Sequence, residues 1–312
     1  MKIKPGTKDV LWVAAGAVAL VLFVAAMLHF RKSGDATSEL AFKARRVDLA
    51  GLMQLDLASA SEAEKSAVLS TTDSDSQTFA DQSRAASAKV EDERIELQEL
   101  LAAGGTQAER ESLARFTTSF AEFQRIDRDL LALAVKNTNV KAYSLAFGPA
   151  AGVLDEMTAA LDVLVSQNAD SPRAKEVMRL AFRVQIGALR IQSLLPPHIA
   201  EESDEKMDDL EASMAAEDAE VHKSLDGLSA LPQLRNDPEV MTAAARYADF
   251  SRIRTRILAL SRENTNVRSL SMSLNQKRKV MLECLAALDA LQQSILAEPI
   301  PGTTYGPRAR PR

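Results

Sequence analysis

The sequence has few cysteines, few aromatic residues, few glycines and prolines, and only a small net charge. Its one cysteine, Cys284, excludes an internal disulfide, and aromatic residues make up only 4% of the chain. Glycine and proline number 12 and 11 among 312 residues, which is few turn-forming residues for a chain long enough to hold two domains. The net charge of −5 provides no basic field that would hold nucleic acid. The remainder, rich in alanine, leucine, glutamate, arginine and serine, is the composition of a helical protein.

One long apolar stretch lies close to the N-terminus. The residues from Val10 to Leu28 include no charged side chain, and a helix of that length roughly matches the 30 Å hydrocarbon thickness of a bilayer. The stretch is longer than the core of a cleaved secretory signal, and the sequence that follows it is a poor cleavage context. We therefore predict an uncleaved transmembrane helix over residues 10–30, after a short tail of residues 1–9. Basic residues flank it on both sides, so the charge count alone leaves the sidedness open.

The rest of the chain contains an internal duplication. Residues 123–164 and 250–291 align without a gap when one is shifted by 127 positions. Both copies contain Leu-Ala-Leu, then Asn-Thr-Asn-Val, then Ala-Ala-Leu-Asp-x-Leu. An ungapped match of this length indicates a duplicated module. A weaker echo of residues 46–52 in residues 183–189 extends the duplication to the first helix of each module.

Apolar residues recur at spacings of three and four beyond each Asn-Thr-Asn motif, which is typical of helices packed in a bundle. The second copy of this seam has one polar exception, Lys277. The spacing slips at the motif itself, where Asn and Thr favour caps and turns over helix interiors. We therefore predict interhelical turns at both motifs, and a ligand-contacting loop is the alternative role. The turn residues are Asn137, Thr138, Asn139, Asn264, Thr265 and Asn266.

Local signals divide the chain into helices. Thr106 followed by Glu109 has the spacing of a capping box, Gly104-Gly105 is a helix-ending signal, and Pro196-Pro197 is expected to end a helix. The predicted fold is all-α: the N-terminal transmembrane helix followed by two tandem antiparallel four-helix bundles. The bundles cover residues 36–168 and 172–297, the first beginning after a short break at residues 33–35. Residues 298–312, rich in Pro, Gly and Arg, are predicted to be a disordered tail.

No catalytic or metal-binding motif is present, so we expect no enzyme activity, no metal site and no cofactor. The three histidines, His29, His198 and His222, are far apart and belong to no Glu-x-x-His or His-x-x-x-His pattern. Cys284 occupies an apolar seam position, which indicates a buried small side chain and not a nucleophile.

The most suggestive polar residues are arginines on the first helix of each module. Arg179, Arg183 and Arg190 are spaced so that they share one helix face, and Arg46 is equivalent to Arg183 in the first module. Guanidinium groups in this pattern are candidates for clamping a ligand carboxylate between helices. The alternative is that they lie along the surface or pair with acidic residues of a neighbouring helix.

Residues 250–291, which include ENTNVRSLSMSLNQKR, resemble the last hairpin of the four-helix-bundle sensor module of methyl-accepting chemotaxis receptors, and residues 123–164 are similar. With the anchor, the resemblance covers residues 10–297 in two tandem copies. It implies a sensor domain outside the cytoplasmic membrane that is often dimeric and binds small solutes between helices. The sequence departs from the family after Ile295, where no second apolar segment or signalling hairpin follows.

We therefore expect a single-pass protein of the inner (cytoplasmic) membrane whose bulk is periplasmic and whose function is sensory or ligand-binding. The expected partners are the lipid bilayer, a small-molecule ligand, and a second copy of the chain or a signalling receptor, with no nucleic acid. The alternative is a structural adaptor whose bundles dock a partner protein. An arginine-lined cavity would favour the sensor, whereas exposed apolar stripes on helix faces would favour the adaptor.

Overall fold

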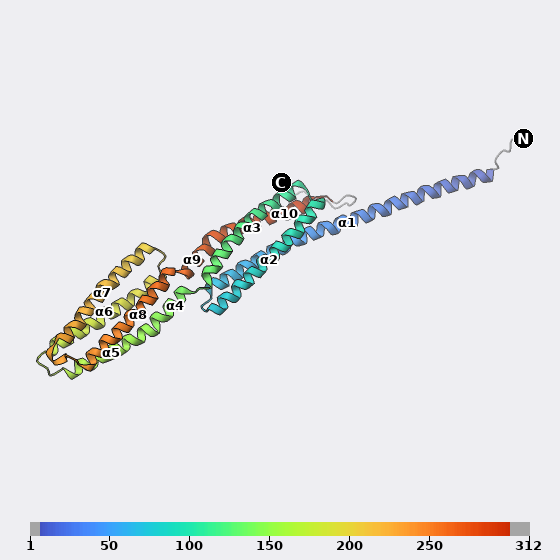
Figure 1. Cartoon of the computed structure of the whole chain (residues 1–312). Helices are drawn as coiled ribbons and strands as arrows, with labels where there is room; N and C mark the ends of the chain where they lie inside the picture. The colour runs from blue at the N-terminus through green and yellow to red at the C-terminus, as the bar shows by residue number, and fades with distance from the viewer. Residues whose placement is uncertain (1–6, 300–312) are drawn as a thin grey trace, which may run out of the picture. The chain divides into compact units, whose positions relative to one another are not determined.

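The computed structural model describes residues 7–299, and it describes side chains from residue 37 onward. Every regular element in this part is helical and none is a strand, which confirms the predicted all-α class. The α-helices are α1 (Thr7–Leu69), α2 (Asp73–Gly104), α3 (Gln107–Ala134), α4 (Thr138–Phe147), α5 (Pro149–Gln167), α6 (Ala174–Ala200), α7 (Asp204–Ala230), α8 (Pro238–Glu263), α9 (Thr265–Ser271) and α10 (Arg278–Ala297) (Figure 1). Two short elements complete the set, the 3-10 turn η1 (Pro232–Leu234) and the π-helical turn η2 (Met272–Lys277).

The first helix is longer than expected. α1 runs without interruption through residues 33–35, so the predicted break there is wrong. The single glycine in that stretch costs a helix only about 1 kcal/mol, which is too little to end it. α1 also contains residues 10–30, but the side chains of this predicted membrane segment lie outside the described residues. Residues 1–6 and 300–312, which hold most of the two predicted tails, lie outside them as well.

Within the described part, one helical stretch, Pro238–Ala297, is long and apolar enough to cross a membrane by length and composition. A core helix of a folded domain meets the same criteria. The apolar seam of this stretch includes Cys284, Leu288 and Leu291, all fully buried against other helices. Packing inside the protein therefore accounts for part of the apolar character of the stretch, of whose most apolar segment 33% is buried.

The described chain forms two compact units, and each is discontinuous in sequence. Unit 1 comprises Met1–Ser61, Arg84–Gln124 and Lys279–Arg312, and unit 2 comprises Glu62–Ser83 and Arg125–Arg278. The predicted bundles, 36–168 and 172–297, do not coincide with these units, because α1, α2 and α3 each contribute residues to both. The physical reason lies at the Asn-Thr-Asn motifs.

Unit 1 is built from stretches of α1, α2, α3 and α10. Phe116, Phe120 and Phe123 of α3 stack in series, with ring centroids 5.3 and 5.9 Å apart. Each fully buried large apolar side chain contributes roughly 1.5–3 kcal/mol relative to its exposed state. The buried set includes Leu49, Met53, Leu57, Val90, Leu97, Leu101, Leu288, Leu291 and Ile295.

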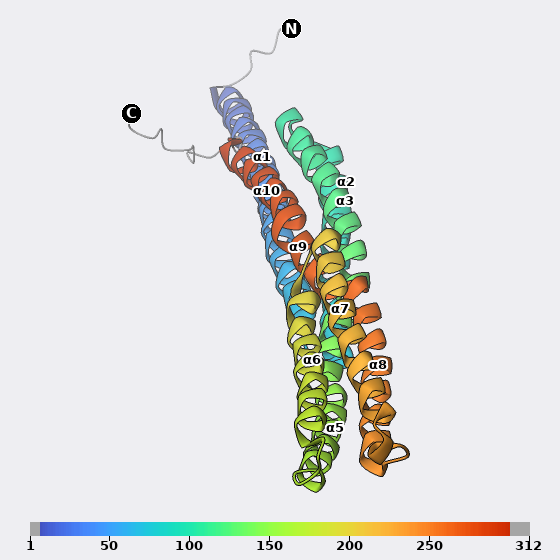
Figure 2. The ribbon, with the colours of Figure 1, turned by 90° about the vertical axis from the view of Figure 1, so that its left-hand side faces the viewer.

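In unit 2, α5, α6, α7 and α8 run side by side (Figures 1 and 2). α6 packs along α7 and α5 packs along α8, around a core that includes Leu154, Leu161, Val184, Ile191, Val221, Leu228, Tyr247 and Phe250. α8 begins at an N-cap, since Asp237 accepts hydrogen bonds from the N–H groups of Glu239 and Val240 at 2.9 and 3.3 Å.

Two of the local signals are confirmed and one is wrong. Thr106 and Glu109 form the predicted capping box of α3, with reciprocal hydrogen bonds of 2.9 and 3.3 Å. α2 ends at Gly104, and the N–H of Gly105 donates to the carbonyl of Leu101. Pro196-Pro197, in contrast, does not end α6, which continues to Ala200. Proline keeps a helical φ, so near a C-terminus it removes hydrogen bonds without forcing the chain out of the helix.

In the first half of each predicted apolar seam, some of the seam residues are exposed and do not belong to the core. Phe147 is 65% exposed and Leu274 is 54% exposed, although both lie at seam spacing. The phase of each seam changes at equivalent positions: Gly148 and Pro149 separate α4 from α5, and the π-turn η2 separates α9 from α10. Spacing alone does not reveal such a change of phase.

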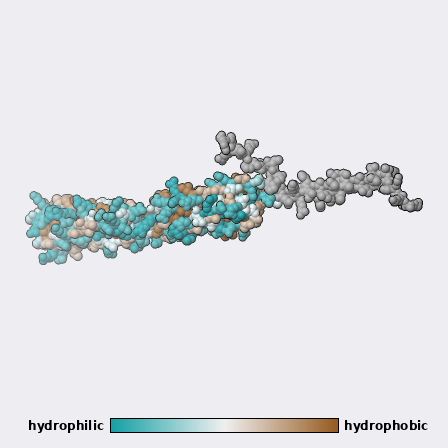
Figure 3. Space-filling model, turned by 90° about the horizontal axis from the view of Figure 1, so that it is seen from above, coloured by the Kyte–Doolittle hydropathy of each residue, from teal (hydrophilic) through white to brown (hydrophobic). Residues whose placement is uncertain are grey.

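Most exposed apolar side chains are scattered, as the face shown in Figure 3 illustrates, where hydrophilic residues predominate and hydrophobic ones form small groups. One set on α6 is different. Met178, Phe182, Ile186 and Leu189 are between 42% and 53% exposed and recur every three or four residues. They form one continuous face of the helix, which we call the α6 stripe.

A glycine pair tests the packing of unit 2. A Cβ added at Gly187 would lie 2.6 Å from Cγ2 of Val221, whereas a Cβ at Gly152 would meet nothing within 4 Å. We expect Gly187→Ala to lower the free energy of unfolding by about 1–3 kcal/mol, because valine is stiff and the core must shift. Gly152→Ala should raise it by about 0.5–1 kcal/mol through helix propensity. Denaturant unfolding measures both, and equal effects would contradict the packing.

Candidate functional site

The candidate site of unit 2 begins with two helix interruptions. Asn137 precedes α4 with φ 50° and ψ 39°, and Asn264 precedes α9 with φ 51° and ψ 38°. This left-handed conformation is uncommon for residues other than glycine, and Asn is among those that tolerate it best. Both motifs therefore interrupt helices, as the sequence predicts.

The chain does not fold back at these interruptions. Leu130 and Leu131, before Asn137, pack in an apolar cluster with Val68 and Ala80, whereas Ala142 and Ala146, after it, pack in a separate core with α6 and α8. After Asn264, α9 extends away from the end of α8 (Figure 1). The predicted hairpin turns are thus kinks, and this difference explains why the units do not follow the predicted bundles.

The two motifs meet each other and exchange hydrogen bonds. The backbone N–H of Thr138 donates to Oγ1 of Thr265, and the N–H of Thr265 donates to Oγ1 of Thr138, both at 3.2 Å. In the same way the N–H of Asn139 donates to Oδ1 of Asn266, and the reverse bond has the same length, 3.1 Å. Equal lengths in both directions show that the two copies are related locally by an approximate two-fold axis. We call the six residues of the two motifs the Asn-Thr layer.

The amide side chains of the layer are also satisfied. Nδ2 of Asn139 donates to Oδ1 of Asn264 at 2.8 Å and to the carbonyl of Ile199 at 2.7 Å. Nδ2 of Asn266 donates to Oδ1 of Asn137 at 2.9 Å, and Nδ2 of Asn137 donates to the Ser76 hydroxyl. Five of the six residues are at most 4% exposed, so each of these bonds replaces water that the fold excludes.

A cleft of about 340 Å³ opens beside the layer. Three pairs of its lining residues occupy equivalent positions in the two copies, 127 positions apart: Asn139 and Asn266, Val140 and Val267, and Tyr143 and Leu270. The end of α1 (Val68, Leu69), the two residues after it (Ser70, Thr71) and the end of α6 (Ile199, Ala200) complete the walls. A molecule in the cleft would therefore contact both copies at once.

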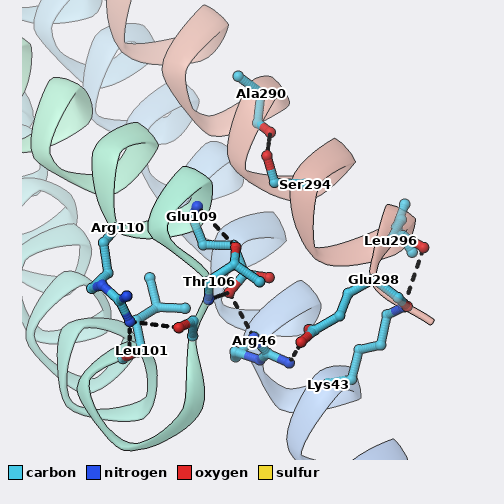
Figure 4. Close-up of polar contacts among 11 residues, drawn as sticks. Lys43, Arg46, Leu101, Thr106, Glu109, Arg110, Ala290, Ser294, Leu296 and Glu298 are labelled. Atoms are coloured by element: carbon cyan, nitrogen blue, oxygen red, sulfur yellow. Dashed lines mark hydrogen bonds and ion pairs between the residues drawn. The ribbon is translucent and has the colours of Figure 1, made fainter. Parts of the chain in front are cut away.

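The predicted arginines do not line this cleft. Arg46 in unit 1 is 2% exposed and is already held by Glu109 at 2.7 Å and by Glu298 at 2.9 Å (Figure 4). Glu109 is the same carboxylate that caps α3, so this ion pair joins α1 to the start of α3. A ligand carboxylate would have to displace one of these partners, at the cost of an unpaired buried charge.

The other three arginines lie on the exposed side of α6 in unit 2. Arg183 pairs with Glu220 at 3.5 Å and Arg190 with Glu217 at 2.9 Å, both on α7. Arg179 is exposed beside them. This is the surface pairing that the sequence allows as the alternative to a ligand clamp, and such exposed pairs contribute about 0–1 kcal/mol each.

A buried histidine that sequence spacing did not single out links three helices of unit 2. His198, on α6, is fully buried, and its Nδ1 and Nε2 lie 2.8 Å from the Ser261 hydroxyl and from the Glu211 carboxylate. Burial raises the pKa of Glu211, but hydrogen bonds from Arg262 and His198 outweigh it and hold that pKa below its ordinary value. Ser261 is also fully buried and donates to the carbonyl of His198, so the group joins α6, α7 and α8. Within the residues that the structure describes, no three His, Cys, Asp or Glu side chains are grouped to hold a metal ion.

Valine substitutions test the Asn-Thr layer. Thr265→Val leaves the buried N–H of Thr138 unpaired, which should lower the free energy of unfolding by about 1–3 kcal/mol, while Thr265→Ser should cost less. The Thr138→Val and Thr265→Val pair should be non-additive by about 0.5–1.5 kcal/mol, because each single change already breaks the 3.1 Å contact between the hydroxyls. Denaturant unfolding measures the cycle, with Thr242→Val on the exposed start of α8 as control. If the changes in the free energy of unfolding are additive and no larger than that of the control, the hydrogen bonds between the two motifs are contradicted.

Comparisons with known proteins add no family to this geometry. No protein-family model matches the chain, and a search of curated proteins finds no match either. The resemblance to chemotaxis-receptor sensor modules therefore stays a prediction from the sequence, and the function has to be argued from the site.

Proposed function

We propose that this protein is a membrane-anchored, extracytoplasmic ligand-binding protein of the sensor type, with the cleft beside the Asn-Thr layer as its ligand site. The observation that carries the proposal is the paired origin of the cleft walls, in which Val140 and Val267 come from equivalent positions of the two copies. A ligand held there would stabilise one packing of the copies over another, which is how binding becomes a signal. The anchor in residues 10–30 and the periplasmic side are part of the proposal and rest on the sequence.

The chemistry of the walls favours a small, neutral and largely apolar ligand. No charged side chain is among the residues that line the cleft, and the amides of Asn139 and Asn266 are committed to the layer. The phenol of Tyr143 donates to the carbonyl of Pro196 at 3.3 Å. A volume of about 340 Å³ is within the range of small-molecule sites. The carboxylate ligand suggested by the arginines has no cationic partner here.

We infer that the layer can switch between two discrete arrangements. Its hydrogen bonds are reciprocal, so a shift of one motif along the other breaks them as a set instead of one by one. Packed elements of this kind switch between arrangements and do not deform gradually. The ligand can shift the equilibrium only by its difference in affinity for the two arrangements.

A thermal-shift screen of the full chain in detergent tests the ligand site. Small neutral compounds such as indole, cyclohexanol and benzyl alcohol should raise the melting temperature more than amino acids, organic acids or divalent cations. A ligand at 100 times its Kd stabilises by about 2.7 kcal/mol. Val267→Trp, which fills the cleft, should abolish the shift, whereas Leu274→Trp on the exposed part of η2 should keep it. If no compound acts, or if both variants respond alike, the site is contradicted.

The α6 stripe favours a second candidate, an adaptor that docks a partner helix. Its four residues expose an apolar face, and the arginines that flank it are neutralised by Glu217 and Glu220. A face of this kind is typical of a protein–protein contact. Phe182→Glu should then abolish a defined cross-link formed from a photoreactive residue at position 186 in cells, while Leu282→Glu, on the exposed face of α10, should not. A stripe that forms no cross-link would remove this candidate.

A further inference from the structure

Unit 2 contains three charged side chains that neither the Asn-Thr layer nor the cleft uses. Glu64 on α1, Asp127 on α3 and Lys277 at the end of η2 have side chains that are 5% exposed or less. Nζ of Lys277 donates a hydrogen bond to Asp127 and lies 3.3 Å from Oε2 of Glu64. We call these residues the buried triad.

The charges of the triad do not balance when all three groups are ionised. One ammonium faces two carboxylates, and an uncompensated charge in a protein interior is strongly unfavourable. The charged neighbours that act on Glu64 are Lys277 and Asp127, and the Ser273 hydroxyl faces it as well. The hydroxyl of Ser83 donates to Oδ2 of Asp127 at 3.5 Å. Lys277 bonds Asp127, whereas its approach to Glu64 forms no well-aligned hydrogen bond, so Glu64 is the group that retains a proton.

The triad takes Asp127 from the first copy and Lys277 from the second, and neither charge recurs at the equivalent position of the other copy. In the first copy the position of Lys277 is taken by Ala150, an apolar residue of the seam. In the second copy the position of Asp127 is taken by Arg254, which pairs with Asp218 instead. Replacing buried ion pairs by apolar residues is often neutral or stabilising, so packing alone does not call for these charges.

The position of the triad connects it to the cleft. Glu64 lies one helical turn before Val68, which lines the cleft from α1, and Lys277 lies about two turns after Leu270, which lines it from α9. The contact between Nζ of Lys277 and Oε2 of Glu64, at 3.3 Å, therefore connects the α1 wall of the cleft to the segment that follows the α9 wall.

We propose that the buried triad is a proton-binding site, in which protonated Glu64 holds the two walls together and loss of its proton to solvent loosens them. Lys277 remains paired with Asp127 throughout. Proton binding stands on the triad alone, whereas its effect on ligand binding rests on the function proposed above.

Burial raises the pKa of Glu64 above its ordinary value of 4.5, and Lys277 offsets part of that rise. The folded state thus keeps the proton to a higher pH than the unfolded state. The stability linked to Glu64 is complete below pH 4.5 and is lost as the pH rises through the folded-state pKa.

Infrared difference spectroscopy of the full chain tests proton binding. At a pH above 4.5 and below the transition, the wild type and Glu62→Gln, an exposed control on α1, should show the C=O band of a buried protonated carboxyl, and Glu64→Gln should lose one carboxyl of intensity. Some intensity should remain, because burial together with Asp56 raises the pKa of Glu93 in unit 1 to about 7. An unchanged band in Glu64→Gln overturns the proposal. If circular dichroism shows that Glu64→Gln folds poorly, the wild type alone gives the test: its carboxyl C=O band should lose the same intensity when the pH is raised above the transition in which Glu64 loses its proton.

Hydrogen exchange tests the link to the cleft. Across the transition, protection of residues 265–277, corrected for intrinsic rates, should fall by on the order of tenfold in wild type and Glu62→Gln and stay constant in Glu64→Gln. Equal behaviour of all three overturns the coupling. A positive result combined with a failed ligand screen would reject the proposed function and leave the proton site in place.

Discussion

The pairing of the two Asn-Thr-Asn motifs is the interaction on which the rest of unit 2 depends. It places two interrupted helices side by side at the point where each one lacks its own backbone hydrogen bonds. It also satisfies backbone N–H groups of Thr138, Asn139, Thr265 and Asn266, which have no partner within their own helices at a first turn. Without the partner motif, each buried donor would cost about 1–3 kcal/mol. Each copy of the module thus completes the other, and the cleft exists because they meet.

Much of this could be predicted from the sequence, and the missing part has a physical cause. Caps such as Thr106 with Glu109 are local, so residue types at fixed spacing identify them. The interruptions at Asn137 and Asn264 were also predictable, because Asn tolerates the left-handed conformation. The direction that the chain takes after each interruption could not be predicted. A single left-handed residue can begin either a hairpin or a kink, and the choice depends on which distant residues are available for packing. The reciprocal bonds span 127 positions, and no local pattern encodes them.

The site could be predicted in part. The sequence marks the Asn-Thr-Asn residues as interruptions, and the structure has interruptions there. It also points to the arginines, because guanidinium groups bind carboxylates, but it does not show that Arg46 is already paired with Glu109. The cleft was hidden because Val140, Tyr143 and Leu270 share the spacing of core residues, and only the change of phase at Gly148 and η2 takes them out of the core. Lys277 is the one polar residue in an apolar seam of the sequence. Its role could not be predicted, because its partners Glu64 and Asp127 come from other helices.

Duplication followed by divergence gives this fold its asymmetry. The copies keep the motif by which they pair but differ beside it, with Ala150 against Lys277, Asp127 against Arg254 and Tyr143 against Leu270. A symmetric pairing with unequal surroundings can favour one arrangement over another, and a small ligand or a proton needs to act on only one side.

Disulfide trapping tests the central claim, the contact between the two motifs, most directly. The Thr138 and Thr265 hydroxyl oxygens lie 3.1 Å apart, so cysteines at both positions, in a chain carrying Cys284→Ala, should form an intramolecular disulfide under mild oxidation. A pair at Thr138 and Thr242 is the control and should stay reduced. Rapid, complete closure of the Thr138 and Thr265 pair, detected by mass and gel mobility, is the predicted result. Two thiols that stay reduced in the folded chain would show that each motif turns within its own separate bundle, and would contradict the account.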